Sequence, residues 1–348
     1  MNLLSEDVRK SAQRYLDSRR SDNRREFFSR SSEDRSLDGS SLHLDLARML
    51  GSFDQHEENL LQELAAAQDK NDGFFHEASE TYTLDHPRVR EMAGTYLGFQ
   101  VGQLFLKVGH TGNEFRFWRE LIDAAKCYEY IEAMPWSSSP WGAGGWLDAL
   151  ATMLRANVLW GFTEYEISVR TVLRWVHDKQ NAKDGLWGTS ECQGIEGQIN
   201  GAYHLLRGTL LAMDSCVPNA HQLMDTILDY IDSSEMFQAG RGEGCHDLDV
   251  FYLLYRLSRQ YPEYRKYDIQ RVARKRLSEV VQFQNDDGGY GFYPHASHEV
   301  HNYRSVGERI AGESDIQGTV FYLTAIKSLF EILDPSSPCP WRFSLTHG

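Results

Sequence analysis

The chain has 348 residues, a net charge of −14, and a composition that is 41% hydrophobic and 25% charged. These values are typical of a folded protein of one or two domains, and they exclude a disordered chain. The acidic balance argues against a general nucleic-acid-binding surface, which needs basic side chains gathered on one face.

Apolar residues recur at helical spacing along almost the whole chain, and alternating strand patterns are scarce. Residues 1–39 are expected to form a charged extension with a short helix near 4–17, and residues 336–348 a tail. Between them we expect one helical domain, residues 40–335. Its predicted helices are 40–50, 54–68, 88–107, 115–133, 146–160, 163–180, 198–213, 219–234, 247–260, 264–284 and 314–333.

Glycine-rich loops alternate with short turns along this helical pattern. Each such loop precedes a helix, and that helix is followed by a turn and a second helix, which indicates repeated helical hairpins with a period of about 45–65 residues. One hairpin cannot bury its apolar face alone, so the hairpins must stack as a solenoid or a closed ring. The loops are NDGFF (71–75), WGAGGW (141–146), DGLWG (184–188), AGRGEG (239–244) and DDGGYGFYP (286–294).

Three of the loops place a glutamine four or five residues before a Gly-x-aromatic sequence, at Gln68, Gln180 and Gln284. This pattern resembles the QW repeat of squalene cyclases and the related loops of protein prenyltransferase β subunits. The resemblance implies an all-α fold, an α/α toroid with inner helices around a central cavity and outer helices around them. The inner helices would be 40–50, 88–107, 146–160, 198–213, 247–260 and 314–333.

The inner helices of a toroid run parallel, so their N-termini collect at one end of the cavity. Asn and Asp are strong N-cap residues, and such residues stand near three of the predicted starts. We therefore expect Asn200, His204, Asp247, Asp249 and Asp315 to lie at the same end.

The sequence Asp247-Leu248-Asp249-Val250 resembles the Asp-x-Asp-Asp motif of class II terpene cyclases, whose middle Asp protonates an alkene. The resemblance makes Asp249 the proton donor, although Val250 replaces the last acid. Residues i and i+2 of a helix point about 200° apart. We therefore expect Asp247 to be the N-cap and Asp249 to face the cavity. Aromatic faces would stabilise the cation that follows; candidates are Tyr96, Phe99, Trp146, Tyr203, Phe251, Tyr252, Phe321 and Tyr322.

Protein prenyltransferases hold zinc with an Asp, a Cys two residues later and a His in a later inner helix. When this pattern is placed on Asp247, the second ligand becomes Asp249 and the late His falls near Gly318. Cys245 and His246 come one residue too early, which leaves only a rearranged site open. We expect no metal and no cofactor.

Two more segments carry candidate residues. Asn200 and His204 are four apart and share one helix face, and a His at a cavity mouth can act as acid or base. The connection 293–304 is too long for a tight turn and could fold over the cavity as a lid. Its histidines, His295, His298 and His301, could also bind a metal if the segment became helical.

Three functions remain open: an isoprenoid-processing enzyme started by protonation from Asp249, a carbohydrate-active toroid enzyme (hydrolase, epimerase or lyase), and a binding scaffold. The first is our leading hypothesis. Two carboxylates about 5–9 Å apart in an open groove would favour the second; its candidate residues are Asp247, Asp249, Asp315, Glu313, His204 and Tyr303.

The candidate site residues fall into two groups. The catalytic candidates are Asp249, Asp247, His204 and Asp315. The substrate-binding candidates are Asn200, Tyr203, His246, Phe251, Tyr252, Trp146, Tyr96, Gln317 and Tyr303.

The expected partner is a small molecule, an isoprenoid or a saccharide, and a partner subunit is possible; nucleic acid is not expected. No apolar run approaches the length that crosses a bilayer, and the N-terminal residues lack the apolar core of a signal peptide. The five cysteines lack CxxC spacing, which favours reduced thiols. We therefore expect a cytoplasmic protein without an integral membrane segment.

Overall fold

A computed structural model describes residues 2–76, 89–189, 191–337 and 339–347. The regular secondary structure of the described chain is almost entirely helical. The α-helices are α1 (Asn2–Ser21), α2 (Leu37–Leu50), α3 (Gln55–Ala66), α4 (Val89–Val108), α5 (Ala124–Glu132), α6 (Pro140–Leu159), α7 (Glu166–Lys179), α8 (Gly194–Gly208), α9 (Ala220–Ser233), α10 (Gly244–Gln260), α11 (Lys266–Val280) and α12 (Ile316–Leu333). Short 3₁₀ helices are η1 (Arg116–Ile122), η2 (Thr163–Tyr165), η3 (Leu211–Met213), η4 (Glu235–Phe237) and η5 (Val281–Phe283), and the strands are β1 (Val300–His301) and β2 (Arg304–Ser305).

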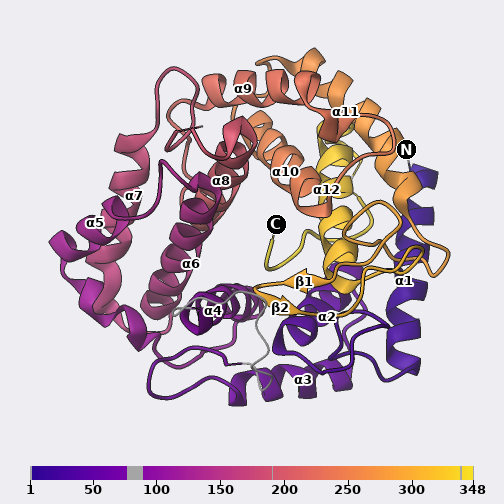
Figure 1. Cartoon of the computed structure of the whole chain (residues 1–348), viewed down its shortest axis with the longest axis horizontal. Coiled ribbons are helices and arrows are strands. Elements are labelled where there is room, and N and C mark those ends of the chain that lie inside the picture. The colour runs from indigo at the N-terminus through magenta and orange to yellow at the C-terminus, as the bar shows by residue number, and fades with distance from the viewer. Residues whose placement is uncertain (1, 77–88, 190, 338, 348) are drawn as a thin grey trace.

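The helices form two concentric layers of a closed ring (Figure 1). The even-numbered helices from α2 to α12 make the inner layer, and each packs on the next. The odd-numbered helices lie outside them. α12 packs on α2, which closes the ring and excludes an open solenoid. The predicted all-α toroid is therefore confirmed.

Inner helices are covered on both sides, so most of their side chains are buried. α12 is the extreme case among the described helices: it alone is long and apolar enough to cross a membrane, and 89% of that window is buried inside the protein. Its hydrophobicity is that of a core helix.

The three Gln–Gly loops share one geometry. In each, the glutamine side-chain Nε2 donates to the carbonyl oxygen of the loop glycine, which has a positive φ and closes the turn that follows an outer helix. The bonds are Gln68–Gly73 (2.8 Å), Gln180–Gly185 (2.8 Å) and Gln284–Gly288 (3.0 Å). A helical-hairpin unit is thus repeated at these loops.

The sequence WGAGGW (141–146) is not a loop, contrary to expectation; it forms the first turns of α6, with Pro140 as the first helical residue. Its glycines serve close helix packing. A Cβ at Gly144 would lie 2.2 Å from the carbonyl oxygen of Gly201 on α8, so only glycine fits there. Gly144 faces Gly201, and Asp148 faces Gly208, which shows that α6 and α8 run parallel.

The expected helix 115–133 is also divided, into η1 and α5. Asp123 separates them, because its extended backbone ends η1 while its carboxylate accepts hydrogen bonds from Ala125 N and Lys126 N at the start of α5. The sequence signal for this break is Asp123, a residue type that favours helix N-caps, within a segment of helical apolar spacing.

Residues 339–347, the terminal segment, enter the middle of the ring (Figure 1). The Asp45 carboxylate on α2 accepts hydrogen bonds from Ser344 Oγ (2.5 Å), Leu345 N (2.6 Å) and Thr346 Oγ1 (2.7 Å). At the end of the segment, the carbonyl of His347 accepts a hydrogen bond from the Tyr203 hydroxyl (2.8 Å). The terminal segment therefore fills part of the space that a toroid encloses.

Candidate functional site

A central pocket of about 200 Å³ lies between α4, α6, α8 and the hairpin β1–β2. Its walls are largely aromatic, and its charged or titratable side chains come from α8 and two tyrosines. The lining residues are Met92, Thr95, Tyr96, Phe99, Trp141, Gly142, Gly145, Trp146, Ala149, His204, Arg207 and Tyr303. Five candidates named from the sequence lie here: Tyr96, Phe99, Trp146, His204 and Tyr303.

Arg207 is held in place by a buried carboxylate on the neighbouring helix. Its Nε donates to Asp148 Oδ2 (2.9 Å), and its NH2 group contacts the same oxygen. Asp148 is 1% exposed and Arg207 4%. Although burial opposes the charged guanidinium, Asp148 holds the pKa of Arg207 above its ordinary value. Sequence reasoning missed this pair, because its members are 59 positions apart.

The Arg207 guanidinium has five N–H groups, and four of them are engaged. Two go to Asp148, one goes to His204 Nδ1 (3.1 Å) and one to the Tyr203 hydroxyl (3.0 Å). The second N–H of NH1 has no hydrogen-bond partner among the described residues, and Arg207 is one of the pocket's lining residues. The guanidinium can therefore donate one more hydrogen bond without losing its support.

His204 has two partners for one ring nitrogen. Nδ1 lies 3.1 Å from Arg207 NH2, which can only donate, and 3.6 Å from Asp148 Oδ2, which can only accept while ionised. The hydrogen bond from Arg207 places the ring proton on Nε2. Nε2 becomes a base only in the other tautomer, in which Nδ1–H gives up the Arg207 bond and turns to Asp148 Oδ2, 3.6 Å away. Burial lowers the pKa of His204, so the ring is neutral at pH 7 and both tautomers are open to it.

The long His-rich connection forms the hairpin β1–β2, and it places Tyr303 in the wall of the pocket. His301 pairs with Asp38 on α2 (2.8 Å), and Asn302 Nδ2 donates to Ala93 O on α4 (3.2 Å). The hairpin therefore bridges two inner helices at the mouth of the pocket. The rings of His298 and His301 lie near each other (centroids 6.2 Å), but the described part of the chain shows no metal-ligand group formed by His295, His298 and His301.

Asp247 is not the N-cap of α10. The helix begins at Gly244, and Asp247 lies one turn inside it, where its two carboxylate oxygens accept from Arg276 Nε (2.6 Å) and NH2 (2.7 Å) on α11. Both side chains are buried, and Arg276 also pairs with Glu279 (2.8 Å). Asp247 thus joins an inner to an outer helix and stays clear of the central pocket.

Asp315 is the N-cap of α12. Both oxygens of its carboxylate accept hydrogen bonds from backbone N–H groups. It accepts from Gly318 N (2.6 Å), Phe292 N (2.8 Å) and His298 N (3.0 Å), while burial raises its pKa to about 6. Gln317 Oε1 bonds His298 Nδ1 (3.0 Å). These two candidates fix the loop before α12 and do not line the central pocket.

Asp249 and Asn200 are the buried polar side chains that stand out in the ring. Asp249 is 1% exposed and its Oδ2 has no hydrogen-bond partner among the described residues; the same holds for both amide atoms of Asn200, which is 0% exposed. The two residues lie one turn before Tyr203 and Tyr252, whose rings touch (centroids 5.8 Å), on the packed helices α8 and α10. Burial raises the pKa of Asp249 well above its usual value, because the carboxylate form loses its hydration there.

The remaining substrate-binding candidates pack in the core. Tyr252 accepts a hydrogen bond from Arg256 NH1 (2.7 Å), and Phe251 lies against Phe237 (centroids 5.9 Å). Tyr203 holds the terminal segment and Arg207, as described above. None of these three lines the central pocket.

The starts of α8, α10 and α12 do gather at one end of the ring. His246 on α10 reaches Glu196 on α8, and Gly244 N donates to the carbonyl of Phe292, whose own N–H binds Asp315. This agrees with the expected gathering of Asn200, Asp247, Asp249 and Asp315. His204 differs, because α8 begins at Gly194 and His204 lies in its second half.

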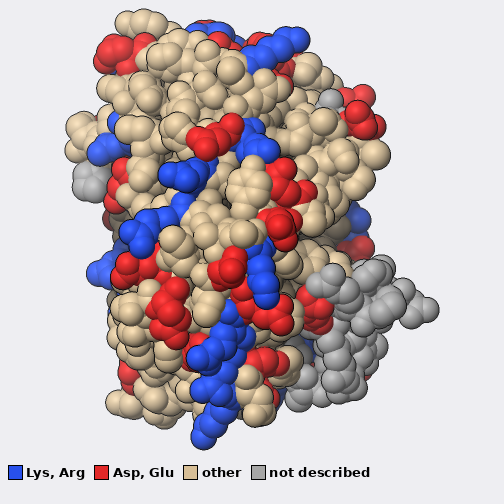
Figure 2. Space-filling view, turned by 90° about the vertical axis from the view of Figure 1, so that its left-hand side faces the viewer, with Lys and Arg blue, Asp and Glu red and all other residues tan. Residues whose placement is uncertain are grey.

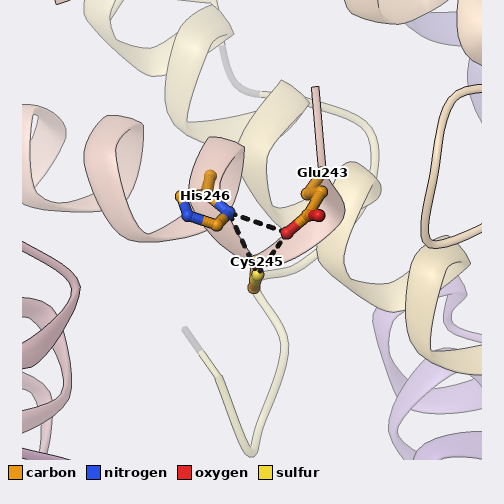
Figure 3. Close-up of side chains that lie close together, drawn as sticks. All are labelled: Glu243, Cys245 and His246. Atoms are coloured by element: carbon orange, nitrogen blue, oxygen red, sulfur yellow. Dashed lines mark hydrogen bonds and ion pairs between the residues drawn. The ribbon is translucent and has the colours of Figure 1, made fainter. Parts of the chain in front are cut away.

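A cluster of four side chains, the rim cluster, lies at this end: Glu196, Glu243, Cys245 and His246 (Figure 3 draws the last three). His246 Nε2 bonds Glu196 Oε1 (2.7 Å), and Nδ1 lies 3.0 Å from Glu243 Oε2 and 3.4 Å from Cys245 Sγ. Burial raises the pKa of the Cys245 thiol to about 11. The ring of Trp141, which lines the central pocket, contacts His246 edge-on (centroids 5.4 Å).

The outer face over α5 and α7 carries acidic and basic side chains interspersed with one another (Figure 2). This face offers no continuous basic stripe of the kind that nucleic-acid binding needs.

No family model and no curated protein matches the chain. Among solved structures, the chain is similar to a "Glycosyl hydrolase family 88 from Bacteroides vulgatus", with a TM-score of 0.51 and 12% sequence identity over 94% of this chain and 99% of that one. At this identity the likeness shows the fold alone, and it agrees with the α/α toroid. It gives no support to the terpenoid cyclase or prenyltransferase type of toroid.

Proposed function

We propose that the chain is a carbohydrate-active enzyme whose central pocket binds a small sugar that carries a carboxylate. The observation that carries this proposal is the composition of the pocket: aromatic walls around one arginine and one neutral histidine. Aromatic faces suit the apolar faces of sugar rings, and a few fixed polar groups orient the ligand. The structural likeness to a glycosyl hydrolase adds support for a saccharide over an isoprenoid.

The size of the pocket argues in the same direction. Its volume of about 200 Å³ is below the range of about 300–1,000 Å³ that drug-sized ligands need, and a long isoprenoid chain needs more. An ion pair at its floor, Arg207 with Asp148, is also a poor neighbour for a hydrocarbon. The isoprenoid hypothesis, which led in the sequence analysis, is therefore weaker than the carbohydrate hypothesis.

Within the carbohydrate-active class, the pocket favours proton transfer over hydrolysis by paired carboxylates. No Asp or Glu occurs among its lining residues in the described chain, and paired acids are what most glycoside hydrolases use. Arg207 instead offers a free N–H for the sugar carboxylate, and His204 offers a nitrogen that changes between acid and base.

The proposed step begins after the ring proton of His204 has moved to Nδ1, the nitrogen that faces Asp148 Oδ2 (3.6 Å). His204 Nε2 then removes the proton on the carbon next to the carboxylate. In an elimination, the electron pair of that C–H bond forms a C=C bond, the neighbouring C–O bond breaks, and the leaving oxygen takes up the proton that His204 has just accepted. In an epimerisation, water gives a proton to the other face of the carbon, and His204 releases its own proton to solvent. Arg207 stabilises the charge that builds on the carboxylate in either case.

The test is exchange of that hydrogen in D₂O, followed by NMR, over a panel of uronate-containing oligosaccharides and their neutral counterparts; a new ultraviolet absorbance reports elimination. We expect exchange or elimination with uronates alone. His204→Asn should lower the rate by about 10²–10⁴-fold, while His221→Asn, on the outer helix α9, should leave it unchanged. Turnover or thermal stabilisation by isoprenoid diphosphates and not by saccharides would return the leading role to the isoprenoid hypothesis.

A further inference from the structure

Three side chains of the rim cluster point their ligand atoms at one small space (Figure 3). Glu243 Oε2, Cys245 Sγ and His246 Nδ1 are separated by 3.0 Å (Glu243 to His246), 3.4 Å (Cys245 to His246) and 3.8 Å (Cys245 to Glu243). All three come from one short stretch, the turn into α10, so the start of a single helix presents them together.

These separations match the edges of a zinc coordination tetrahedron. Zn–S bonds of about 2.3 Å and Zn–N or Zn–O bonds of about 2.0–2.2 Å at tetrahedral angles give ligand-to-ligand distances of about 3.3–3.6 Å. The three observed distances lie within a few tenths of an ångström of that range, so only small side-chain rotations separate this arrangement from coordination. Thiolate, imidazole and carboxylate are also the donor types that zinc takes in proteins.

A fourth residue supplies the support that zinc-bound histidines have in proteins. Glu196 Oε1 lies 2.7 Å from His246 Nε2, and Glu196 is itself fixed by the Tyr230 hydroxyl (2.9 Å). The carboxylate accepts from Nε2–H and fixes the ring so that Nδ1 faces Glu243 and Cys245. Without a metal ion, Nδ1 donates its proton to Glu243 Oε2, and an ion would take the place of that proton. A carboxylate bonded to the far nitrogen is the usual second partner of a metal-binding histidine.

We propose that Glu243, Cys245 and His246 bind a zinc ion, with Glu196 as the positioning residue of His246. Three protein ligands leave one tetrahedral position for water or an oxygen ligand, the pattern of zinc sites that act on bound molecules. An open groove of about 750 Å³ runs along Glu196 and Glu243 and gives the ion a path from solvent. On binding, Zn²⁺ displaces the thiol proton of Cys245 and any proton on His246 Nδ1.

The test uses the full chain, freed of metal with a chelator, in a Cys192→Ser/Cys216→Ser background that removes the two exposed thiols. Titration with ZnCl₂ should give one equivalent, and CoCl₂ should give the near-ultraviolet sulfur-to-cobalt charge-transfer band of a thiolate ligand. Cys245→Ser in the same background should lose that band. Glu196→Gln should keep the band and weaken zinc binding about 10–100-fold.

His76→Ala is the matched control, because Asp69, Asp72 and His76 form the other group of close ligand atoms in the described chain. Zinc binding should survive this change. Absence of stoichiometric binding in the background protein, a cobalt band that persists in Cys245→Ser, or binding lost in His76→Ala would each overturn the proposal.

If Cys245→Ser does not fold, the background protein itself gives the answer through thiol labelling mapped by mass spectrometry. One equivalent of zinc should protect Cys245 from alkylation, and unchanged labelling would overturn the proposal. None of these readouts depends on a substrate, so they stand or fall separately from the proposed sugar chemistry.

Discussion

At the start of α10, Asp247 accepts two hydrogen bonds from Arg276, whereas two residues further along the same helix Asp249 has a buried oxygen without a hydrogen-bond partner among the described residues. Both carboxyls are equally removed from water. The difference lies in what faces them. Asp247 points outward to the basic helix α11, and Asp249 lies at the level of Asn200, another buried polar group without a described partner.

This contrast separates residues that stabilise the ring, such as Asp247, from buried polar residues that do not stabilise it, such as Asp249. A buried polar group without a partner costs free energy. Such groups persist most often where a function uses them. A functional role of Asp249 therefore stays a prediction, whereas the contacts of Asp247 are those of a structural residue.

Asp247→Asn should have the largest effect on stability. Removing one charge of a buried ion pair leaves the other uncompensated, which costs about 3–5 kcal/mol; the lower end is expected, because Glu279 still pairs with Arg276. If Asp247 were only an N-cap, as expected from the sequence, the same substitution would lower the free energy of unfolding by at most about 1 kcal/mol. Denaturant unfolding of Asp247→Asn beside Asp249→Asn measures the contrast, and equal losses in the two variants would erase it.

The second prediction concerns pH. The pKa of Asp249 is raised in the folded state, while an unfolded Asp has a pKa of about 3.9. Above pH 4 the unfolded chain releases this proton and the folded chain keeps it, so the wild type loses stability relative to Asp249→Asn as pH rises. The slope is at most about 1.4 kcal/mol per pH unit. Melting temperatures of both proteins between pH 4 and 6 should diverge; parallel curves would mean that Asp249 is ionised in the fold.

The smallest effect is expected at Asn200. Asn200→Leu replaces an unpartnered buried amide by an apolar group of similar size, so the change in unfolding free energy should stay within about 1 kcal/mol and can be favourable. Thr319→Val, which removes a hydroxyl that is hydrogen-bonded to Tyr290 O and Asp315 O, is the matched control and should be the more destabilising of the two. The reverse order would show that Asn200 has a partner in solution.

Local sequence signals predicted most of the fold. The Gln–Gly loops and the helical periodicity depend on residues within one hairpin, so the toroid and its inner helices could be named in advance. The start of α6 could not, because the reason for its glycines is the backbone of Gly201, which lies in another helix. From the local sequence alone, a run of glycines predicts a loop. Only the structure shows that the neighbouring helix packs against these glycines.

Less of the candidate site than of the fold could be predicted, because the site also depends on contacts between helices that are far apart in the sequence. Tyr96, Trp146, His204 and Tyr303 were identified because they are functional residue types on inner helices or on a long connection. Arg276 and Asp148 were not, since their partners lie 29 and 59 positions away and no spacing rule links them. These long-range pairs decide which buried carboxylates have a basic partner and which have none.

The hydrogen bonds between Asp45 and residues 344–346 join positions 299 to 301 apart, nearly the full length of the chain. Each helical hairpin can form from neighbouring residues, but this junction has to wait until the intervening hairpins have brought α2 beside the end of the chain. Loop-closure entropy makes such a contact late and slow. We therefore expect the filling of the ring by residues 339–347 to be among the late events of folding.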